Sequence, residues 1–316
     1  MNNKVMITGV NGFIGSNICR ELKAKGYEII GVALDQTCLV KENIVYEQAD
    51  ISDFDRINQL FNKHKPMCVI HLAAIVHKKS MLAAYDDFYR VNYLSSKNIF
   101  ENCAKNGVKK VFFASTVEVY DMEVSQKITE ESTTKPTTDY GKTKLMAEKA
   151  LIKLAKSSKF DYAIMRFAPV YGQEFTLNLD RRMYLVKHKV IYYFRRGEYF
   201  YNMCSIHNIV DFVKETININ TTVKGIYNIS DTNIFNMKQI IGFEMRKNKV
   251  LCIKMPYSLT KFVIKLIEKG LRCINKKSIL SNYNFEKIFR CNVFKNAKAN
   301  QVVGNFKWDI QSTLYK

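Results

Sequence analysis

Tyr140 and Lys144 are the two side chains whose types and spacing most directly suggest chemistry. They lie four residues apart, so a helix would present both on one face. A fixed ammonium beside a tyrosine favours the phenolate, which would lower a pKa that is ordinarily about 10. Such a tyrosine could take up a proton near neutral pH. A chance Tyr/Lys pair on a surface helix is the alternative, and the surrounding elements must decide between the two.

A glycine-rich turn follows the first apolar strand of the chain. Val5–Thr8 predicts a strand, and a helical pattern then runs on to Leu22. Between them glycine recurs at every third position, at Gly9, Gly12 and Gly15. Glycine lets a backbone turn tightly against a pyrophosphate, whose charge then faces the N-terminus of the following helix. The turn therefore predicts a dinucleotide site.

An acidic residue ends the second expected strand, Glu28–Leu34. Asp35 can accept hydrogen bonds from the hydroxyls of an adenosine ribose and would repel a 2′-phosphate. We therefore expect NAD rather than NADP as the cofactor. The alternative for Asp35 is an ordinary loop residue.

Strand and helix patterns alternate through the first half of the chain. Further strands are expected at 44–46, 67–72, 111–114 and 162–166, and helices at 53–63, 88–106 and around Tyr140. This alternation predicts an α/β fold with a doubly wound parallel sheet (Rossmann), which binds ligands at the carboxyl ends of its strands. Ser115, Thr116 and Glu118 follow such an end, one strand before the Tyr140 helix.

The glycine spacing, the hydroxyl at a strand end and Tyr140-xxx-Lys144 together resemble the extended short-chain dehydrogenase/reductase family. The nucleotide-sugar epimerases and dehydratases are the most similar group, chiefly over residues 4–172. The resemblance implies that Tyr140 is the catalytic base, that Thr116 orients the reacting oxygen, and that Lys144 binds the nicotinamide ribose. It also implies the cofactor-binding residues Gly9, Gly12, Phe13, Ile14, Gly15, Asp35, Asp50, Ile51, Leu72, Ala73, Ala74, Asn92, Tyr140, Lys144 and Phe167.

The reaction implied by the resemblance is a sugar 4-epimerisation through a transient 4-keto intermediate. We expect a UDP-N-acetylhexosamine-type substrate and a role in surface polysaccharide or glycan biosynthesis. Related 4,6-dehydratases carry an acid where this chain has Val117, which cannot protonate a departing hydroxyl. Glu118 is kept, so a dehydratase or reductase remains an alternative. A non-catalytic nucleotide- or RNA-binding relative is a remote alternative, which a net charge of +20 permits.

The second half departs from the family pattern at its phosphate contacts. Pro169 replaces an asparagine that helps hold the nucleotide diphosphate, and Tyr201–Asn208 lacks a phosphate-binding arginine. Four arginines nearby in sequence could replace the missing phosphate-binding arginine: Arg181, Arg182, Arg195 and Arg196. The alternative is that they are solvated loop charges. The candidate substrate residues are Ser115, Glu118, Pro169, Arg181 and Arg195. We expect His207 to cap the next helix, 209–217, rather than to act in catalysis.

Residues 256–274 predict an amphipathic helix. Its apolar positions recur at helical spacing: Leu259, Phe262, Val263, Leu266, Ile267, Leu271 and Ile274. We expect this helix to cover the core of the substrate domain, and a position in a membrane interface is the alternative. Together with Pro169 and Asn208–Asp211, the helix is also similar to epimerases of undecaprenyl-diphosphate-linked N-acetylhexosamine. A lipid carrier therefore stays open.

Length and composition fit two globular domains. The chain has 316 residues, of which 47% are hydrophobic, and we expect an NAD-binding domain over 1–172, with a return near 206–230, and a substrate domain over 173–316. An excess of 49 Lys+Arg over 29 Asp+Glu favours phosphate-bearing partners, with a dispersed composition bias as an equal alternative.

Eight cysteines without a CxxC pair predict reduced thiols and no metal site. Without a signal peptide or spanning segment, we expect a cytoplasmic protein; the inner membrane face and a homodimer stay open.

Overall fold

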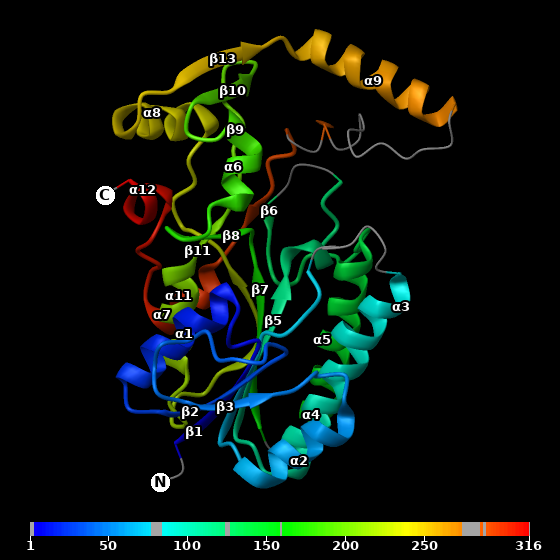
Figure 1. The fold of residues 1–316 in the computed structure, drawn as a ribbon, viewed down its shortest axis with the longest axis vertical. Coiled ribbons are helices and arrows are strands. Elements are labelled where there is room, and N and C mark those ends of the chain that lie inside the picture. Colours follow the sequence, from blue (N-terminus) through cyan, green and yellow to red (C-terminus); the bar gives the residue numbers. More distant parts are fainter. Residues whose placement is uncertain are drawn as a thin grey trace.

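The computed structural model describes residues 3–76, 84–123, 127–158, 160–273, 285–286 and 289–315. Figure 1 shows a layered body built on a long parallel sheet, with a smaller part lying beyond the carboxyl ends of its strands. The smaller part comes almost entirely from the second half of the chain. Ligands that reach the sheet's carboxyl edge therefore lie between the two parts.

The large sheet contains seven strands, all paired in parallel. They are β1 (Lys4–Thr8), β2 (Glu28–Ala33), β3 (Val45–Gln48), β4 (Cys68–His71), β5 (Lys110–Thr116), β7 (Asp161–Phe167) and β12 (Lys224–Ile229). Their order is β12-β7-β5-β4-β1-β2-β3, so the winding direction reverses between β1 and β4. Doubly wound sheets bind their ligands at that reversal. The predicted fold class is confirmed.

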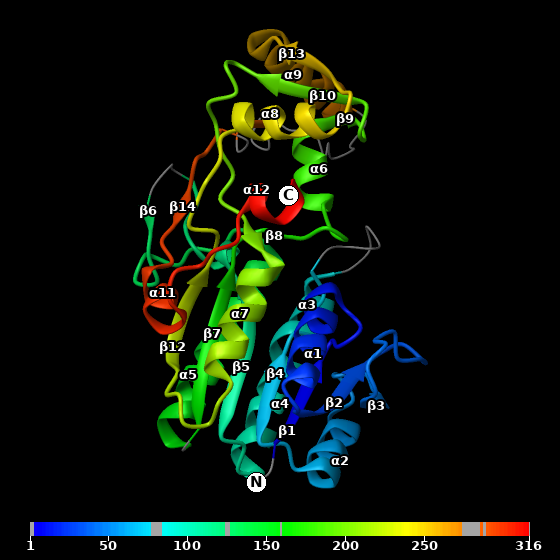
Figure 2. The same ribbon diagram turned by 90° about the vertical axis from the view of Figure 1, so that its left-hand side faces the viewer.

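Helices cover both faces of this sheet (Figures 1 and 2). One face carries α1 (Phe13–Ala24), α7 (Ile206–Thr216) and α11 (Ala297–Val303), and the other carries α2 (Phe54–His64), α4 (Ser95–Lys105) and α5 (Asp139–Ser157). Side chains alternate along a strand, so Phe112 of β5 joins the apolar core on the first face and Phe113 the core on the second. Because both faces are buried, the strands read as continuous apolar runs.

The helix expected over 88–106 is not regular at its start. A short α3 (Tyr85–Phe88) leads into a π-helical segment, η1 (Tyr89–Leu94), before α4 begins. The Ser95 hydroxyl donates to the Arg90 carbonyl oxygen at 3.0 Å, five residues back, as the wider turn requires. Such π-turns recur at functional sites, and this one contains Asn92.

The smaller part is built around a three-stranded sheet, β13-β10-β9. Its elements are α6 (Leu177–Met183), β9 (Tyr184–Val186), β10 (Val190–Phe194), α8 (Met237–Lys247), β13 (Leu251–Met255), α9 (Tyr257–Cys273) and α12 (Ile310–Leu314). Two short parallel pairs join it to the body: β8 (Val170–Tyr171) with β11 (Cys204–Ser205), and β6 (Lys127–Ile128) with β14 (Val293–Phe294).

Helix α9 does not cover the core of the smaller part as the sequence pattern suggested. Only Ile264 is buried among its described side chains, whereas Leu259, Phe262, Val263 and Leu266 are 44–58% exposed. The helix extends from β13 along the outer edge of the smaller part (Figure 1), and Ile274, its expected last residue, lies outside the described residues. No helix in the described part is both long and apolar enough to cross a membrane.

Candidate active site

The start of α5 is anchored to the turn that follows β5. Thr138 caps the helix, because its hydroxyl oxygen accepts from the Gly141 N–H at 3.0 Å and its proton goes to Glu118 Oε2 at 2.8 Å. A side chain at Gly141 would lie 2.7 Å from the Glu118 carbonyl oxygen, so only glycine permits this approach. The anchor holds the first turns of α5, with Tyr140 and Lys144, against the residues at the end of β5.

Lys144 is almost completely buried beneath Tyr140. It is 1% exposed, and its ammonium donates to the Ala114 carbonyl oxygen at 2.8 Å. The Nζ atom lies 4.7 Å from the centre of the Phe113 ring and 5.9 Å from that of the Tyr140 ring. Burial lowers the pKa of Lys144 to about 7, against the opposing charge of Glu148. The amine can therefore gain or lose a proton near neutral pH.

Tyr140 itself differs from the sequence-based expectation. Burial raises its pKa above the usual value, and the nearby Glu118 carboxylate raises it further. The reason is that the Lys144 amine is desolvated and turned to a backbone carbonyl, so its charge does not outweigh burial. The pair is held side by side as predicted, but in this state the phenol keeps its proton.

The last two residues of β5 point to opposite faces of the sheet. The Thr116 hydroxyl oxygen accepts from the Glu118 N–H at 3.2 Å, which leaves its proton for another acceptor. Ser115 is instead buried and donates to Glu148. Glu148 in turn accepts two hydrogen bonds from Arg166, at 3.0 and 2.6 Å. Ser115 was expected to contact substrate, and strand alternation places it in this buried ion-pair network instead.

The glycine turn after β1 makes room for a phosphate group. Gly9 has φ +75°, and a side chain on it would lie 2.9 Å from the Ala73 amide nitrogen. A side chain on Gly15 would lie 2.8 Å from the Cα of Val10. Within the described residues, no side chain caps α1 and no acid lies in its first turn. The N–H groups there can receive phosphate oxygens, so the turn fits the pyrophosphate of a dinucleotide.

Asp35 lies beside this turn, in the loop after β2. Its carboxylate accepts from the Asn11 amide at 2.9 Å, and its carbonyl oxygen accepts from the Tyr46 hydroxyl at 2.6 Å. Since Asn11 belongs to the glycine turn, the acid is held next to the place predicted for the pyrophosphate. Asp50, further along the same edge, is exposed and accepts from the Ser52 N–H at 2.8 Å, while Ile51 is buried.

Asn92 lies behind the cofactor-binding edge rather than on it. The side chain is fully buried; it accepts from the Ile75 N–H and donates to the Ile75 carbonyl oxygen, both at 2.9 Å. Both ends of the amide are thereby used, so the expectation that it lines the cofactor is corrected. It fixes the loop after β4, in which Leu72, Ala73 and Ala74 are partly exposed.

Two aromatic residues of the expected cofactor set pack against other parts of the protein. The ring of Phe13 stacks on Phe175, with 5.0 Å between ring centres, so it joins the glycine turn to the segment after β8. Ile14, beside it, packs on the core of this face. Phe167 is buried next to Thr116 in the β5–β7 register. These side chains are therefore engaged in packing within the protein.

The arginines near the substrate side differ in where they lie. Arg181 is exposed, and Arg195 stacks over Tyr257 and Phe289, 4.6 Å from each ring centre, in the turn after β10. The expected substrate contacts of Arg181 and Arg195 are therefore not supported. Arg182 is less exposed, and its guanidinium lies 4.8 Å from the Tyr201 ring centre. Burial lowers the pKa of Arg182, and the Tyr201, Tyr192 and Glu118 side chains oppose this shift.

Pro169 and His207 have structural contacts. The carbonyl oxygen of Pro169 accepts from the Cys204 N–H at 3.0 Å and begins the β8–β11 pair. Ser205, not His207 as expected, caps α7, since its hydroxyl oxygen accepts from the His207 N–H at 3.3 Å. The His207 ring lies 4.4 Å from that of Trp308. The expectation that His207 is structural agrees with these contacts, but through stacking rather than capping.

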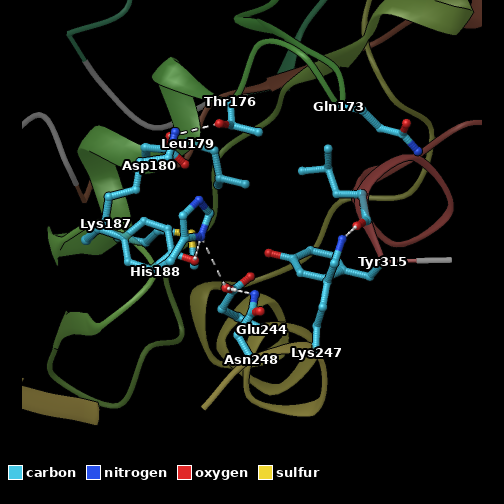
Figure 3. Close-up of a pocket in the computed structure, with 13 residues that line it drawn as sticks. Gln173, Thr176, Leu179, Asp180, Lys187, His188, Glu244, Lys247, Asn248 and Tyr315 are labelled. Carbon is cyan, nitrogen blue, oxygen red and sulfur yellow. Dashed lines mark hydrogen bonds and ion pairs between the residues drawn. The ribbon is translucent and has the colours of Figure 1, made fainter. Parts of the chain in front are cut away.

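A cavity of about 410 Å³ lies on the other side of α6, among α6, β9, α8 and α12 (Figure 3). Its charged groups already have partners in the protein: Asp180 with Lys187 at 2.7 Å, Glu244 with Asn248 at 2.7 Å, and Lys247 with the Leu314 carbonyl oxygen at 2.6 Å. The last of these contacts ties α12 to α8. Thr116, Tyr140 and Lys144 do not line this cavity.

Comparison with known proteins points to one family. Residues 5–229 match the model of the NAD dependent epimerase/dehydratase family. A UDP-glucose 4-epimerase of Bacillus subtilis is 30% identical over 179 residues, 53% of each chain. A dTDP-D-glucose 4,6-dehydratase of Dictyostelium discoideum is 30% identical over 191 residues, 54% of this chain and 44% of its own. The chain thus spans about half the length of the curated relatives it matches.

The fold is shared over nearly the whole chain with solved structures. The structure of a Thermotoga maritima UDP-glucose 4-epimerase with UDP-glucose superposes with a TM-score of 0.76 at 21% identity. The match covers 99% of this chain and 96% of that one. At this identity the likeness concerns the fold, including the smaller part, where the sequence departs most from the family pattern.

Proposed function

The chain belongs to the NAD-dependent epimerase/dehydratase family, as the resemblance predicted, and we propose that it is a 4-epimerase of a nucleotide-linked, UDP-N-acetylhexosamine-type sugar. The arrangement of Tyr140, Lys144 and Thr116 at the carboxyl edge of the sheet carries this proposal. Val117, apolar and buried, supports epimerisation over dehydration because it cannot protonate a leaving hydroxyl. A role in surface polysaccharide biosynthesis is part of the same proposal.

The residues present fit NAD. The N–H groups at the start of α1 would hold the pyrophosphate, Asp35 the adenosine ribose and Lys144 the nicotinamide ribose. NAD, when bound, supplies the hydride acceptor and donor. Gly9 and Gly15 let the turn pack closely against the backbone of Ala73 and Val10, and the Asn92–Ile75 hydrogen bonds keep the neighbouring loop fixed. Asp35 favours a free 2′-hydroxyl over a 2′-phosphate.

Tyr140 and Thr116 would divide the work on the sugar's 4-hydroxyl. Tyr140 takes the hydroxyl proton as the carbon is oxidised and returns it after hydride is delivered to the other face. Thr116 donates to the same oxygen with its hydroxyl proton, while its hydroxyl oxygen accepts from the Glu118 N–H. A protonated Lys144 would favour the Tyr140 phenolate and so oppose the rise in the tyrosine pKa caused by burial.

Tyr140→Phe tests this proposal directly. It removes the proton acceptor while keeping the ring, and positioned proton transfer contributes on the order of 10²–10⁴-fold. We expect epimerisation to fall by at least that factor, with NAD affinity retained. Tyr162→Phe, a partly buried tyrosine at the amino end of β7, is the matched control and should keep full activity. Full activity in Tyr140→Phe would rule out the mechanism.

An epimerase of a polyprenyl-diphosphate-linked sugar is the second candidate, favoured by one observation. The apolar face of α9 is exposed, and a basic amphipathic helix of this kind can lie in a membrane interface, which would place the protein at the inner face of the membrane. Offering the protein UDP-linked and lipid-diphosphate-linked N-acetylhexosamines, with NMR identification of the sugar formed, separates the two candidates. Turnover of the lipid-linked sugar alone would overturn the nucleotide carrier.

A further inference from the structure

Arg182 is an inward-facing cation with very few contacts. Its Nη1 donates to the Asn178 carbonyl oxygen at 2.9 Å, within its own helix. Its guanidinium rests on the Tyr201 ring at 4.8 Å. Among the described residues, no carboxylate lies within ion-pair distance, and no other acceptor reaches its remaining N–H donors. A guanidinium has five such donors, so most of them point to groups that the protein does not provide.

Tyr201, the platform beneath Arg182, also lacks an acceptor. Its hydroxyl oxygen is buried and has no hydrogen-bond partner among the described residues. A buried donor left without a partner is destabilising, and a buried charge without a counter-charge is more so. Two such groups in contact indicate that a ligand supplies the missing acceptor oxygens. The ligand chemistry that suits both is an anion with several oxygens.

The site of this anion is set by α6. Leu179, Asp180 and Met183 of the same helix line the cavity of Figure 3, so Arg182 projects from another face. On that face it comes under the influence of Glu118, whose carboxylate is engaged by the cap of the Tyr140 helix at 2.8 Å. Helix α6 lies beyond the carboxyl ends of the sheet strands (Figure 1), so an anion bound by Arg182 lies on the substrate side of the catalytic residues, apart from the glycine turn of β1.

We propose that Arg182, supported by the Tyr201 ring, binds the diphosphate of the sugar substrate. This inference rests on the proposed function for the identity of the ligand. The charge-assisted hydrogen bonds of a guanidinium suit phosphate oxygens, and the aromatic platform fixes its orientation without neutralising it. Arg181, the neighbouring residue, is exposed and takes no part.

The test measures binding of UDP by calorimetry, without turnover. Hydrogen bonds to charged groups contribute to the binding free energy, so Arg182→Gln should weaken UDP binding on the order of ten- to a hundredfold. Arg182→Lys should lose less, and Arg181→Gln, one position away, should bind UDP as the wild type does. NAD affinity should be unchanged in all three, because the dinucleotide has its own site.

Thermal unfolding without ligand gives a second, independent readout. Arg182 is partly buried and has no carboxylate partner among the described residues, so the melting temperature of Arg182→Gln should equal or exceed that of the wild type, as expected for a binding residue. A lower melting temperature would identify Arg182 as structural and overturn the proposal. Equal UDP affinity in wild type and Arg182→Gln would also overturn it, while leaving the proposed epimerase intact.

Two further ligands separate this inference from the proposed function. If inorganic pyrophosphate and a short prenyl diphosphate bind with the same dependence on Arg182 but UDP does not bind, the subsite stands and the nucleotide carrier is wrong. If Arg182→Gln weakens UDP-glucuronate but not UDP, the residue binds a sugar carboxylate and the diphosphate assignment is wrong.

Discussion

Two inward-facing arginines, one in each part of the molecule, have opposite surroundings. Arg166 of β7 is 3% exposed and meets Glu148, 1% exposed, at 2.6 Å; it also stacks over the Tyr120 ring at 4.6 Å. Arg182 of α6 also stacks on a tyrosine, but within the described chain no carboxylate pairs with it. The aromatic contact is common to both arginines, and the counter-charge is what differs.

The comparison extends to the two parts as wholes. In the body, the buried Arg166 is matched by Glu148 and apolar side chains close two cores. In the smaller part, no described carboxylate pairs with Arg182, and apolar side chains of α9 are exposed to solvent. Groups whose partners are inside the protein stabilise the fold, whereas groups without such partners indicate where other molecules bind. The difference therefore assigns Arg166 to stability, and Arg182 and the exposed face of α9 to recognition.

The largest effect should come from breaking the Arg166–Glu148 pair. Glu148→Ala leaves a buried guanidinium without its counter-charge and frees Ser115, and this should lower the free energy of unfolding by about 3–5 kcal/mol. Chemical denaturation measures the loss. Glu101→Ala breaks the exposed pair with Lys97 on α4 and should cost at most about 0.5 kcal/mol. Similar losses in both variants would show that the buried Arg166–Glu148 pair contributes no more to stability than an exposed pair.

The body could be predicted from sequence because its signals are local and repeated. The turn Gly9–Gly15, the apolar strands and the spacing of Tyr140 and Lys144 each follow from backbone geometry that a short segment determines. The roles of Ser115 and Asn92 could not be predicted, because they depend on contacts with Glu148, 33 residues away, and with Ile75, 17 residues away. Contacts with residues distant in the sequence determine whether such a polar side chain supports the fold or faces a ligand.

The smaller part was less predictable for a related reason. Helical spacing identified α9, but a periodic pattern does not show whether the apolar face meets the protein or the solvent. Arg181 and Arg182 are identical in type and adjacent, and only the position of α6 turns one outward and the other inward. Knowledge of helix phase relative to Leu179 and Met183, both buried, would have distinguished them.

Lys144 offers an intermediate test, because it is a buried cation in the body that also lacks a carboxylate within ion-pair distance among the described residues. Its pKa of about 7 in the folded chain is below its ordinary 10.5. Between these values the unfolded chain binds the proton and the folded chain does not, so stability falls as pH falls through that window. Lys144→Met should remove this slope and raise the free energy of unfolding at pH 7 by about 1–2 kcal/mol.

Lys142→Met on the exposed side of α5 is the control for this measurement. Lys142 lies in a surface pair with Asp139 at 3.3 Å, so its removal should leave the pH profile parallel to that of the wild type. Denaturation midpoints between pH 7 and pH 10 report the slope. A profile of Lys144→Met parallel to the wild type would show that the amine is charged throughout, and the catalytic lysine would then resemble Arg166 rather than Arg182.

The smallest change in stability should come from α9, where the largest change in recognition is expected. Leu266 is 53% exposed on α9 and Met245 is 56% exposed on α8, so aspartate at either should change the free energy of unfolding by less than about 0.5 kcal/mol. Lys265 and Lys269 flank the apolar face, and a lipid surface with negative headgroups would match both the apolar face and the lysines.

We expect binding to phosphatidylglycerol vesicles, measured by sedimentation, to weaken about tenfold in Leu266→Asp and to be unchanged in Met245→Asp. Binding that is lost equally in both variants would reflect net charge alone. A concentration-dependent dimer that Leu266→Asp abolishes, without vesicle binding, would show that α9 meets a second copy of the chain instead of a membrane.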